Sequence, residues 1–271
     1  APIRESREAR ARTMRELKSG ARLLALVCMW LASGALLGAR APEPTVPPET
    51  RLWLWAWERP EDLRFLGDRR DVGVAYLART VLVADQAVTV RPRRQPLRAS
   101  LSTPLTAVVR IEVPRGVPPS HDSLDELVRV SKEAIDGTRV TRLQVDYDAR
   151  ASEIPYYRAF LSKLRAALPS GTWLGITAIA AWCGDEHSWL STPPAVDAVV
   201  PMVFSMGNDA PRVRTWLALR GGFSLEACRG HYGVSTAEPY SIPDGTRVVY
   251  AFSPTAFTPD LVSRLPFWNH P

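Results

Sequence analysis

The sequence predicts an α/β protein folded as a single (β/α)8 barrel of the TIM type, and three observations carry that prediction. The chain has 271 residues, and 46% of them are hydrophobic, which is enough for one large domain with a full core. Eight short apolar runs follow one another along the chain. Helical patterns separate most of these runs, and alternation of strands and helices over this length is typical of a parallel barrel.

The first two units depart from this regular alternation, so we expect an irregular barrel there. Trp53, Trp55 and Trp57 alternate along the first apolar run, which places their side chains on one face of a strand. The second strand is followed by the pattern of a hairpin with Asp85 and Gln86 near its turn, where a helix would be regular. The predicted elements are a strand at 51–57, a short helix at 60–67, a strand at 72–77 and a hairpin over 80–91.

The remaining units alternate more regularly. The first long helix has Asp122 or Ser123 as its N-cap and Gly137 as its terminator. The later helices likewise lie between apolar runs that are short enough to be strands. We expect strands at 105–113, 140–148, 173–178, 197–204, 231–236 and 247–252, and helices at 123–136, 153–168, 209–219 and 259–265.

Residues 1–41 have the pattern of an N-terminal leader. They hold eight Lys or Arg against three Glu, a net charge of +5 out of +6 for the chain. The uncharged run Leu23 to Ala39 precedes Ala39-Arg40-Ala41, as in a secretory signal with a small-residue cleavage site. An uncleaved membrane anchor is the alternative. We expect a leader at 1–41, a Pro-rich linker at 42–50, one barrel domain at 51–271, and export to the periplasm or the cell exterior.

Charge distribution and motifs exclude several classes of function. Because the excess positive charge lies in the leader, no basic face for nucleic acid is expected. The four His residues lack paired spacing, so Asp185-Glu186-His187 does not indicate a metal site. We expect no metal, no cofactor, and membrane contact only through an uncleaved leader, and we leave the oligomeric state open.

Two cysteines lie outside the leader, Cys183 and Cys228. An even pair in an exported protein suggests a disulfide. The predicted topology argues against it, because Cys183 follows the end of one strand whereas Cys228 precedes the start of another, which places them at opposite rims of a barrel. We therefore expect two buried free thiols.

Candidate site residues are sought at the C-terminal ends of the strands, where parallel barrels carry their active sites. In the stretch Leu143 to Asp148, the side chains of Gln144, Asp146 and Asp148 share one face. Two carboxylates this close push their pKa values apart, so that one is protonated as an acid and the other is ionised. The alternative for Asp146 is a structural ion pair with Arg110 inside the barrel.

Further rim residues complete the predicted site. Glu112 shares a face with Arg110 and is the third catalytic candidate after Asp148 and Asp146. Acids, aromatics and an arginine that converge on one rim suit a carbohydrate, because sugars stack on aromatic faces and form hydrogen bonds with carboxylates. The substrate-binding candidates are Trp57, Arg110, Trp182, Asp185, Met202, Phe204 and Glu238, of which Trp182, Met202 and Phe204 could instead be packing residues.

Four blocks of this sequence resemble an uncharacterised family of exported bacterial proteins, domain of unknown function 3142. The resemblance extends over nearly the whole chain after the leader. It implies nothing about activity, because the family has no assigned reaction. The blocks are Leu143 to Ala149, Ile176 to Cys183, Val199 to Gly207 and Gly233 to Pro239.

A more distant resemblance is to the chitinase-like glycoside hydrolases, whose fourth strand ends in alternating acids with a terminal Glu as proton donor. That pattern places Asp148 at the donor position and Asp146 at the preceding acid. This chain departs from it at Thr141 and Gln144, where the family has acids, and at Ser205, where a sixth-strand motif has Asp. The resemblance thus implies either altered chemistry or a site that only binds.

We therefore expect a secreted, glycoside hydrolase-like protein that acts on a polysaccharide or oligosaccharide. In this hypothesis Asp148 is the general acid, and Asp146 orients it and stabilises positive charge on the sugar. The alternative is a non-catalytic carbohydrate-binding or envelope protein on the same barrel.

Overall fold

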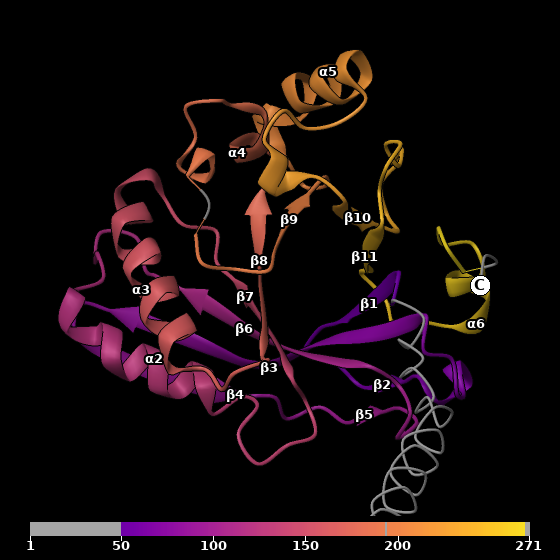
Figure 1. Cartoon of the computed structure of the whole chain (residues 1–271). Helices are drawn as coiled ribbons and strands as arrows, with labels where there is room; N and C mark the ends of the chain where they lie inside the picture. Colours follow the sequence, from indigo (N-terminus) through magenta and orange to yellow (C-terminus); the bar gives the residue numbers. More distant parts are fainter. Residues whose placement is uncertain (1–49, 193, 269–271) are drawn as a thin grey trace, which may run out of the picture. The chain divides into compact units, whose positions relative to one another are not determined.

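The computed structural model describes residues 50–192 and 194–268, and its centre is a closed barrel of eight parallel strands (Figure 1). In chain order the strands are β1 (Leu52–Ala56), β3 (Val72–Ala84), β6 (Leu105–Glu112), β7 (Arg142–Asp146), β8 (Trp173–Ile179), β9 (Ala198–Met202), β10 (His231–Ser235) and β11 (Val248–Phe252). Each strand pairs in parallel with the next around the wall, and β1 closes the ring by pairing with both β11 and β3. The predicted TIM-like barrel is therefore confirmed.

The first two units are irregular, as the sequence predicts. The strand β3 continues to Ala84 and forms an antiparallel hairpin with β4 (Ala87–Pro92). The chain turns at Asp85, whose φ of 52° is the left-handed conformation that Asp tolerates in tight turns. This hairpin stands where a regular barrel has a helix, and it confirms the predicted turn.

The predicted helix at 60–67 does not form as one element. The chain there folds as the short strand β2 (Glu61–Asp62) and the 3-10 helix η1 (Arg64–Leu66), and β2 pairs with β5 (Leu97–Arg98). Glu61 is buried and accepts hydrogen bonds from the Arg59 side chain at 2.7 Å and from the Phe257 backbone at 3.0 Å. These contacts favour an extended backbone over a helical one.

Helices form the outer layer of the barrel. Figure 1 shows α2 and α3 side by side, and their apolar residues Leu127 and Phe160 belong to the same buried cluster as Leu143 and Val145 of β7. The outward face of β7 is thereby covered. The helical elements are η2 (His121–Ser123), α2 (Leu124–Lys132), η3 (Ala151–Glu153), α3 (Ile154–Ala167), α4 (Ala180–Gly184), η4 (Trp189–Ser191), η5 (Gly207–Asp209), α5 (Ala210–Arg220), η6 (Glu226–Cys228) and α6 (Pro259–Ser263).

Large side chains fill the inside of the barrel near its N-terminal end. Two glycines make room for tryptophans: a Cβ on Gly73 would lie 2.6 Å from the Trp53 ring, and one on Gly175 would lie 2.3 Å from the Trp173 ring. The Arg142 guanidinium lies 4.9 Å from the Trp53 ring centre and 3.7 Å from that of Trp173. The predicted alternation of Trp53 and its neighbours is confirmed, and this end of the barrel is closed.

The two cysteines outside the leader form a disulfide, so the prediction of free thiols was wrong. Cys183 lies in α4 and Cys228 in η6, and their Cα atoms are 5.7 Å apart. The sequence placed the two cysteines at opposite rims of the barrel, but neither α4 nor η6 stays at the rim where its neighbouring strand ends or begins. Both α4 and η6 pack on β9, and both cysteines belong to the buried cluster outside the barrel wall.

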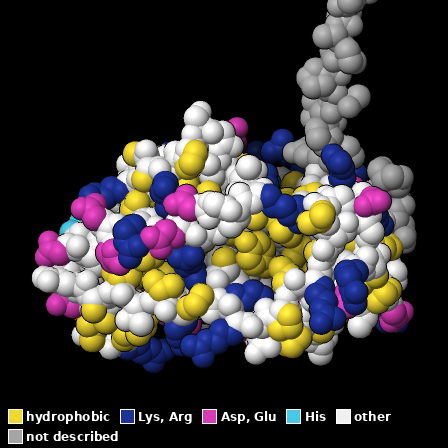
Figure 2. Space-filling view, turned by 90° about the horizontal axis from the view of Figure 1, so that it is seen from below, with side chains coloured by type: hydrophobic (Ala, Val, Ile, Leu, Met, Phe, Trp, Pro, Cys, Tyr) yellow, Lys and Arg dark blue, Asp and Glu magenta, His cyan; other side chains and the backbone are white. Residues whose placement is uncertain are grey.

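Basic side chains do not gather into one continuous patch on the face seen from below. Lys and Arg are interspersed there with Asp and Glu, and hydrophobic side chains gather near the centre (Figure 2). In the described ranges, no helix is long and apolar enough to cross a membrane. The predicted leader at 1–41 and the linker up to residue 49 lie outside the described residues.

Candidate functional site

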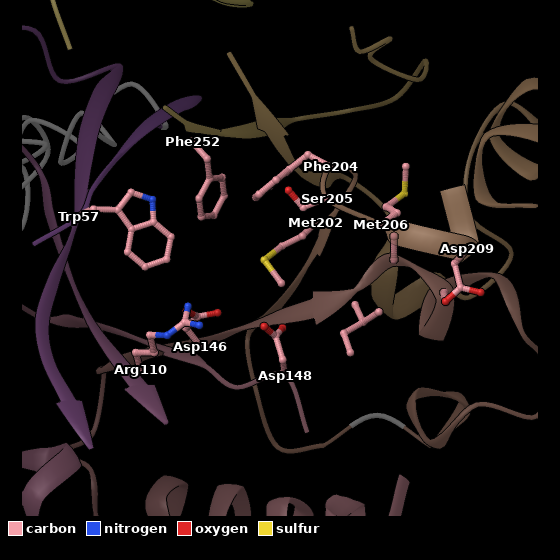
Figure 3. Close-up of a pocket in the computed structure, with 13 residues that line it drawn as sticks. Trp57, Arg110, Asp146, Asp148, Met202, Phe204, Ser205, Met206, Asp209 and Phe252 are labelled. Atoms are coloured by element: carbon pink, nitrogen blue, oxygen red, sulfur yellow. The ribbon is translucent and has the colours of Figure 1, made fainter. Parts of the chain in front are cut away.

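A cavity of about 330 Å³ lies at the C-terminal ends of the barrel strands, where the sequence places the site (Figure 3). The last residues of four strands line it: Asp146 of β7, Ile179 of β8, Met202 of β9 and Phe252 of β11. We call this cavity the aromatic pocket. Of the predicted site residues, those that line it are Trp57, Arg110, Asp146, Asp148, Met202 and Phe204.

Three aromatic side chains form one wall of the aromatic pocket. The ring centres of Phe204 and Phe252 are 4.6 Å apart, and those of Trp57 and Phe252 are 6.2 Å apart. Trp55 stacks on Phe252 from inside the barrel, with ring centres 4.4 Å apart, and so supports this wall. Such a wall offers flat apolar surface to a ligand beside polar groups.

Asp146 is held inside the barrel by two partners. Its side chain is 3% exposed, and its Oδ2 atom accepts a hydrogen bond from Nη1 of Arg110 at 2.9 Å. Its Oδ1 atom accepts one from the Thr177 hydroxyl at 2.8 Å. Burial raises the pKa of Asp146, and the nearby Asp148 adds to this, while Arg110 and Thr177 act in the opposite direction without cancelling the rise. The structural ion pair between Asp146 and Arg110, which was the alternative to a catalytic role for Asp146, is therefore present.

Asp148 differs from Asp146 in having no hydrogen-bond or ion-pair partner among the residues that the structure describes. Its side chain is exposed to the aromatic pocket, and the carboxyl group points into the cavity (Figure 3). The surrounding walls remove water from this group and raise its pKa, which Arg110 only partly offsets. Asp148 is thus the carboxyl group of this pocket that is available to a ligand and inclined to hold a proton.

The backbone around Asp148 is fixed by a buried glutamate that sequence reasoning missed. Glu153 accepts hydrogen bonds from the Tyr147 hydroxyl and from the Arg150 backbone N–H, both at 2.8 Å. Tyr147 and Ala149 are buried on the outward side, so Asp148 between them faces inward. A Glu five residues after the end of the predicted strand, at the start of a helical pattern, is an N-terminal signal that could have indicated this role.

Glu112, the third predicted catalytic residue, does not line the aromatic pocket. It forms an ion pair with Arg91 and a longer one with Arg110, at 3.4 Å. It borders a second hollow of about 310 Å³, which we call the arginine groove. The groove shares Arg110, Asp146 and Asp148 with the aromatic pocket, and its other lining residues are Ile111, Glu112, Val113, Arg115, Tyr147, Arg150 and Glu153.

Three predicted substrate-binding residues do not line the aromatic pocket. Trp182 packs edge-on against Trp189, with ring centres 5.4 Å apart, against the outer core. Asp185 accepts a hydrogen bond from the His187 backbone at 2.9 Å. Glu238 accepts one from the Ser205 backbone at 2.9 Å, so its contact is with the loop that borders the pocket. The sequence places all three after strand ends, but the loops there carry them away from the cavity.

The family comparison covers the part of the chain that contains these strands. Residues 102–214 match the profile of the family described as Domain of unknown function (DUF3142). This part of the chain is similar to the DUF3142 family. The match includes β6, β7, β8 and β9, and thus Asp146 and Asp148, whereas the block Gly233 to Pro239 lies outside it.

One solved structure to which this chain is similar is the crystal structure of the Bacillus cereus spore cortex-lytic enzyme SleL. The sequences are 14% identical and the TM-score is 0.38. The match covers 69% of this chain and 50% of that chain, so it spans half the length of the SleL chain. Among curated proteins, none matches the sequence.

Met206 and Asp209 are among the pocket residues that sequence reasoning missed. Ser205 and Gly207 have φ values of 51° and 53°, so the chain turns back on itself after β9 and brings both residues to the cavity. Asp209 forms an ion pair with Arg212 at 2.7 Å. An acid close to a Gly in the loop after a barrel strand was the available signal.

The aromatic pocket shows no arrangement suited to a metal ion. In the ranges 50–192 and 194–268, no group of three or more His, Cys, Asp or Glu side chains lies close enough to hold one. Asp146 has both oxygens engaged by Arg110 and Thr177. The site therefore combines a carboxyl group of raised pKa, that of Asp148, with aromatic side chains.

Proposed function

We propose that this protein binds a polysaccharide in the aromatic pocket and hydrolyses a glycosidic bond there, with Asp148 as the general acid. The observation that carries the proposal is the unpaired Asp148 carboxyl group, which has a raised pKa and points into a cavity with an aromatic wall. A general acid must hold its proton at the working pH, and a raised pKa serves that purpose.

In this proposal the aromatic residues of the pocket bind the sugar, Asp148 donates the proton, and Asp146 stabilises the charge that develops. The rings of Trp57 and Phe204 stack on the apolar faces of sugar units and bring the bond near Asp148. The Asp148 proton passes to the oxygen of the leaving sugar as the bond between that oxygen and the sugar carbon breaks. A water molecule then bonds to this carbon and releases a proton, which restores the Asp148 carboxyl group. Asp146 stays in place beside Arg110 and Thr177, where its charge favours the positive charge that develops on the sugar ring.

A second candidate function is binding without catalysis. Hydrolysis by a pair of carboxyl groups needs a second group that acts as base or nucleophile. Asp146 and Glu112 both form ion pairs with Arg110, and Asp209 forms one with Arg212. This engagement of the other acids favours a carbohydrate-binding protein on the same barrel.

The release of reducing ends from a panel of polysaccharides tests the assignment of Asp148. Wild type should release them, and Asp148→Asn should lose at least a hundredfold in rate while it folds normally, because a general acid contributes typically 10²–10⁴-fold. The matched control Asp185→Asn removes an acid on the same rim but outside the pocket, and it should keep the wild-type rate. Equal rates for wild type and Asp148→Asn contradict the assignment, and binding without turnover in wild type supports the second candidate.

We also propose that the protein acts outside the cytoplasm. The Cys183–Cys228 disulfide supports this, because disulfides persist mainly in oxidising compartments. The basic and apolar pattern of residues 1–41 supports it independently. A fusion of residues 1–50 to a reporter enzyme that is active only after export should be active, and an inactive but well-expressed fusion contradicts the proposal.

A further inference from the structure

The arginine groove continues the aromatic pocket past Asp148. The two hollows share Arg110, Asp146 and Asp148, and the groove extends along the C-terminal ends of β6 and β7. A polymer whose scissile bond lies at Asp148 therefore has sugar units on both sides of that residue. One side meets aromatic rings, and the other meets charged side chains.

The charges of the arginine groove almost all pair with one another. Glu112 pairs with Arg91 and Arg110, and Asp146 with Arg110. Glu153 pairs with Arg150 at 2.6 Å. Arg115 is the exception among the cations of the groove, and it is exposed. Within the described part of the chain, its side chain forms neither an ion pair nor a hydrogen bond.

The turn that carries Arg115 is held in place. It runs from Pro114 to Val117, closes with a hydrogen bond from the Val117 N–H to the Pro114 carbonyl at 3.4 Å, and uses Gly116 at a φ of 79°. The Arg150 guanidinium donates hydrogen bonds to the carbonyls of Val113 and Pro114, at 3.0 and 3.1 Å. Arg150 thus anchors the turn, and Arg115 is presented at the edge of the groove.

We propose that Arg115 pairs with a carboxylate group of the substrate and that the polysaccharide is therefore an acidic one. An unpaired guanidinium is a ready partner for a planar carboxylate, which it can bind through two parallel hydrogen bonds. A sugar unit of the polymer lies in the aromatic pocket, and a unit that carries a carboxylate lies in the arginine groove. This inference rests on the proposed function, because it assigns the substrate class of the same site.

Calorimetry with hexamers of galacturonate, alginate and hyaluronan tests the inference, each compared with its carboxyl-reduced, neutral counterpart. Wild type should bind at least one acidic hexamer about tenfold more tightly than its neutral form, and the preference should shrink as salt is raised. Arg115→Gln should lose most of that preference. The control Arg70→Gln removes an exposed arginine before β3, at the opposite end of the barrel, and it should keep the preference.

The possible outcomes separate this inference from the proposed hydrolysis. Equal binding of acidic and neutral forms by wild type, no binding of any acidic hexamer, or an unchanged preference in Arg115→Gln overturns the inference. Hydrolysis of neutral glycans by wild type, without tighter binding of any acidic hexamer than of its neutral form, would keep the proposed reaction and overturn the inference. Charge-selective binding that needs Arg115, with no turnover of any acidic hexamer, would keep the inference and overturn the reaction.

Discussion

Arg110 and Asp146 are directly opposite each other in the parallel pairing of β6 with β7, and their side chains meet at 2.9 Å inside the barrel. The register of the two strands thus brings the pair together. Two residues further along, Asp148 has no such partner, because β7 ends at Asp146 and its pairing with β6 ends there. The ends of two neighbouring strands therefore produce one engaged carboxylate and one free carboxyl group.

Removal of Arg110 should destabilise the fold through Asp146. Arg110→Met leaves a buried carboxylate without its cation, which costs about 3–5 kcal/mol in a fully buried pair and less here because the Arg110 side chain is 33% exposed. We expect a loss of about 2 kcal/mol in urea denaturation at pH 7. In an Asp146→Asn background the same substitution should cost much less, and an equal cost in both backgrounds would show that the pair is not the cause.

Asp148→Asn should make the protein more stable at neutral pH. Because the folded state raises the pKa of Asp148, its contribution is fully present below the unfolded pKa of about 3.9 and is lost as pH rises through the folded pKa. Asparagine removes that loss, so the variant should have a higher Tm than wild type at pH 7 and the same Tm near pH 3.

Asp62 offers a control of opposite sign for that experiment. A hydrogen bond from Arg64 lowers the pKa of Asp62 to about 2, so its contribution is present above the unfolded pKa and is lost as pH falls toward 2. Asp62→Asn should therefore lower the Tm at pH 7. A stabilising effect of both substitutions at pH 7 would contradict the pKa directions inferred from the structure.

Reduction of the disulfide should weaken the barrel without changing the site. The two cysteines are 45 residues apart, and closing a loop of that length stabilises a fold by about 4 kcal/mol in the chain-entropy account. The double variant Cys183→Ala, Cys228→Ala should lose about that much free energy of unfolding. Wild type in reductant should lose a similar amount, and the double variant should not respond to reductant.

Trp57→Ala should weaken ligand binding more than it weakens the fold. Trp57 is half-buried at the pocket mouth, 6.2 Å from the Phe252 ring centre, whereas Trp55 behind it is fully buried. We expect the Kd for a bound oligosaccharide to rise about tenfold, which corresponds to about 1.4 kcal/mol. Trp57→Phe should recover part of the affinity, and an unchanged Kd in Trp57→Ala would remove this ring from the binding surface.

The order of the strands and the position of Asp148 could be predicted from sequence because both depend on local patterns. Strand alternation alone places Asp146 and Asp148 on the inward face, and the barrel topology places that face at the C-terminal rim. The alternating tryptophans of β1 were predictable for the same reason. These features need no knowledge of which distant segments meet.

The parts that sequence reasoning missed depend on contacts between distant segments. Trp182 follows β8 directly, yet α4 carries it against the outer core, and Cys183 consequently meets Cys228. Asp209 reaches the pocket because two left-handed residues reverse the loop after β9. The spacing of the acids does not encode either course, since each is set by packing that forms only in the complete fold.

The filled N-terminal end of the barrel restricts where a ligand can enter and leave. Trp53, Trp173 and Arg142 occupy that end, with Gly73 and Gly175 leaving room for the two indoles. The lumen is therefore no tunnel. A ligand beside Asp148 therefore enters and leaves on the C-terminal side of the barrel, where a long polymer lies across the aromatic pocket and the arginine groove.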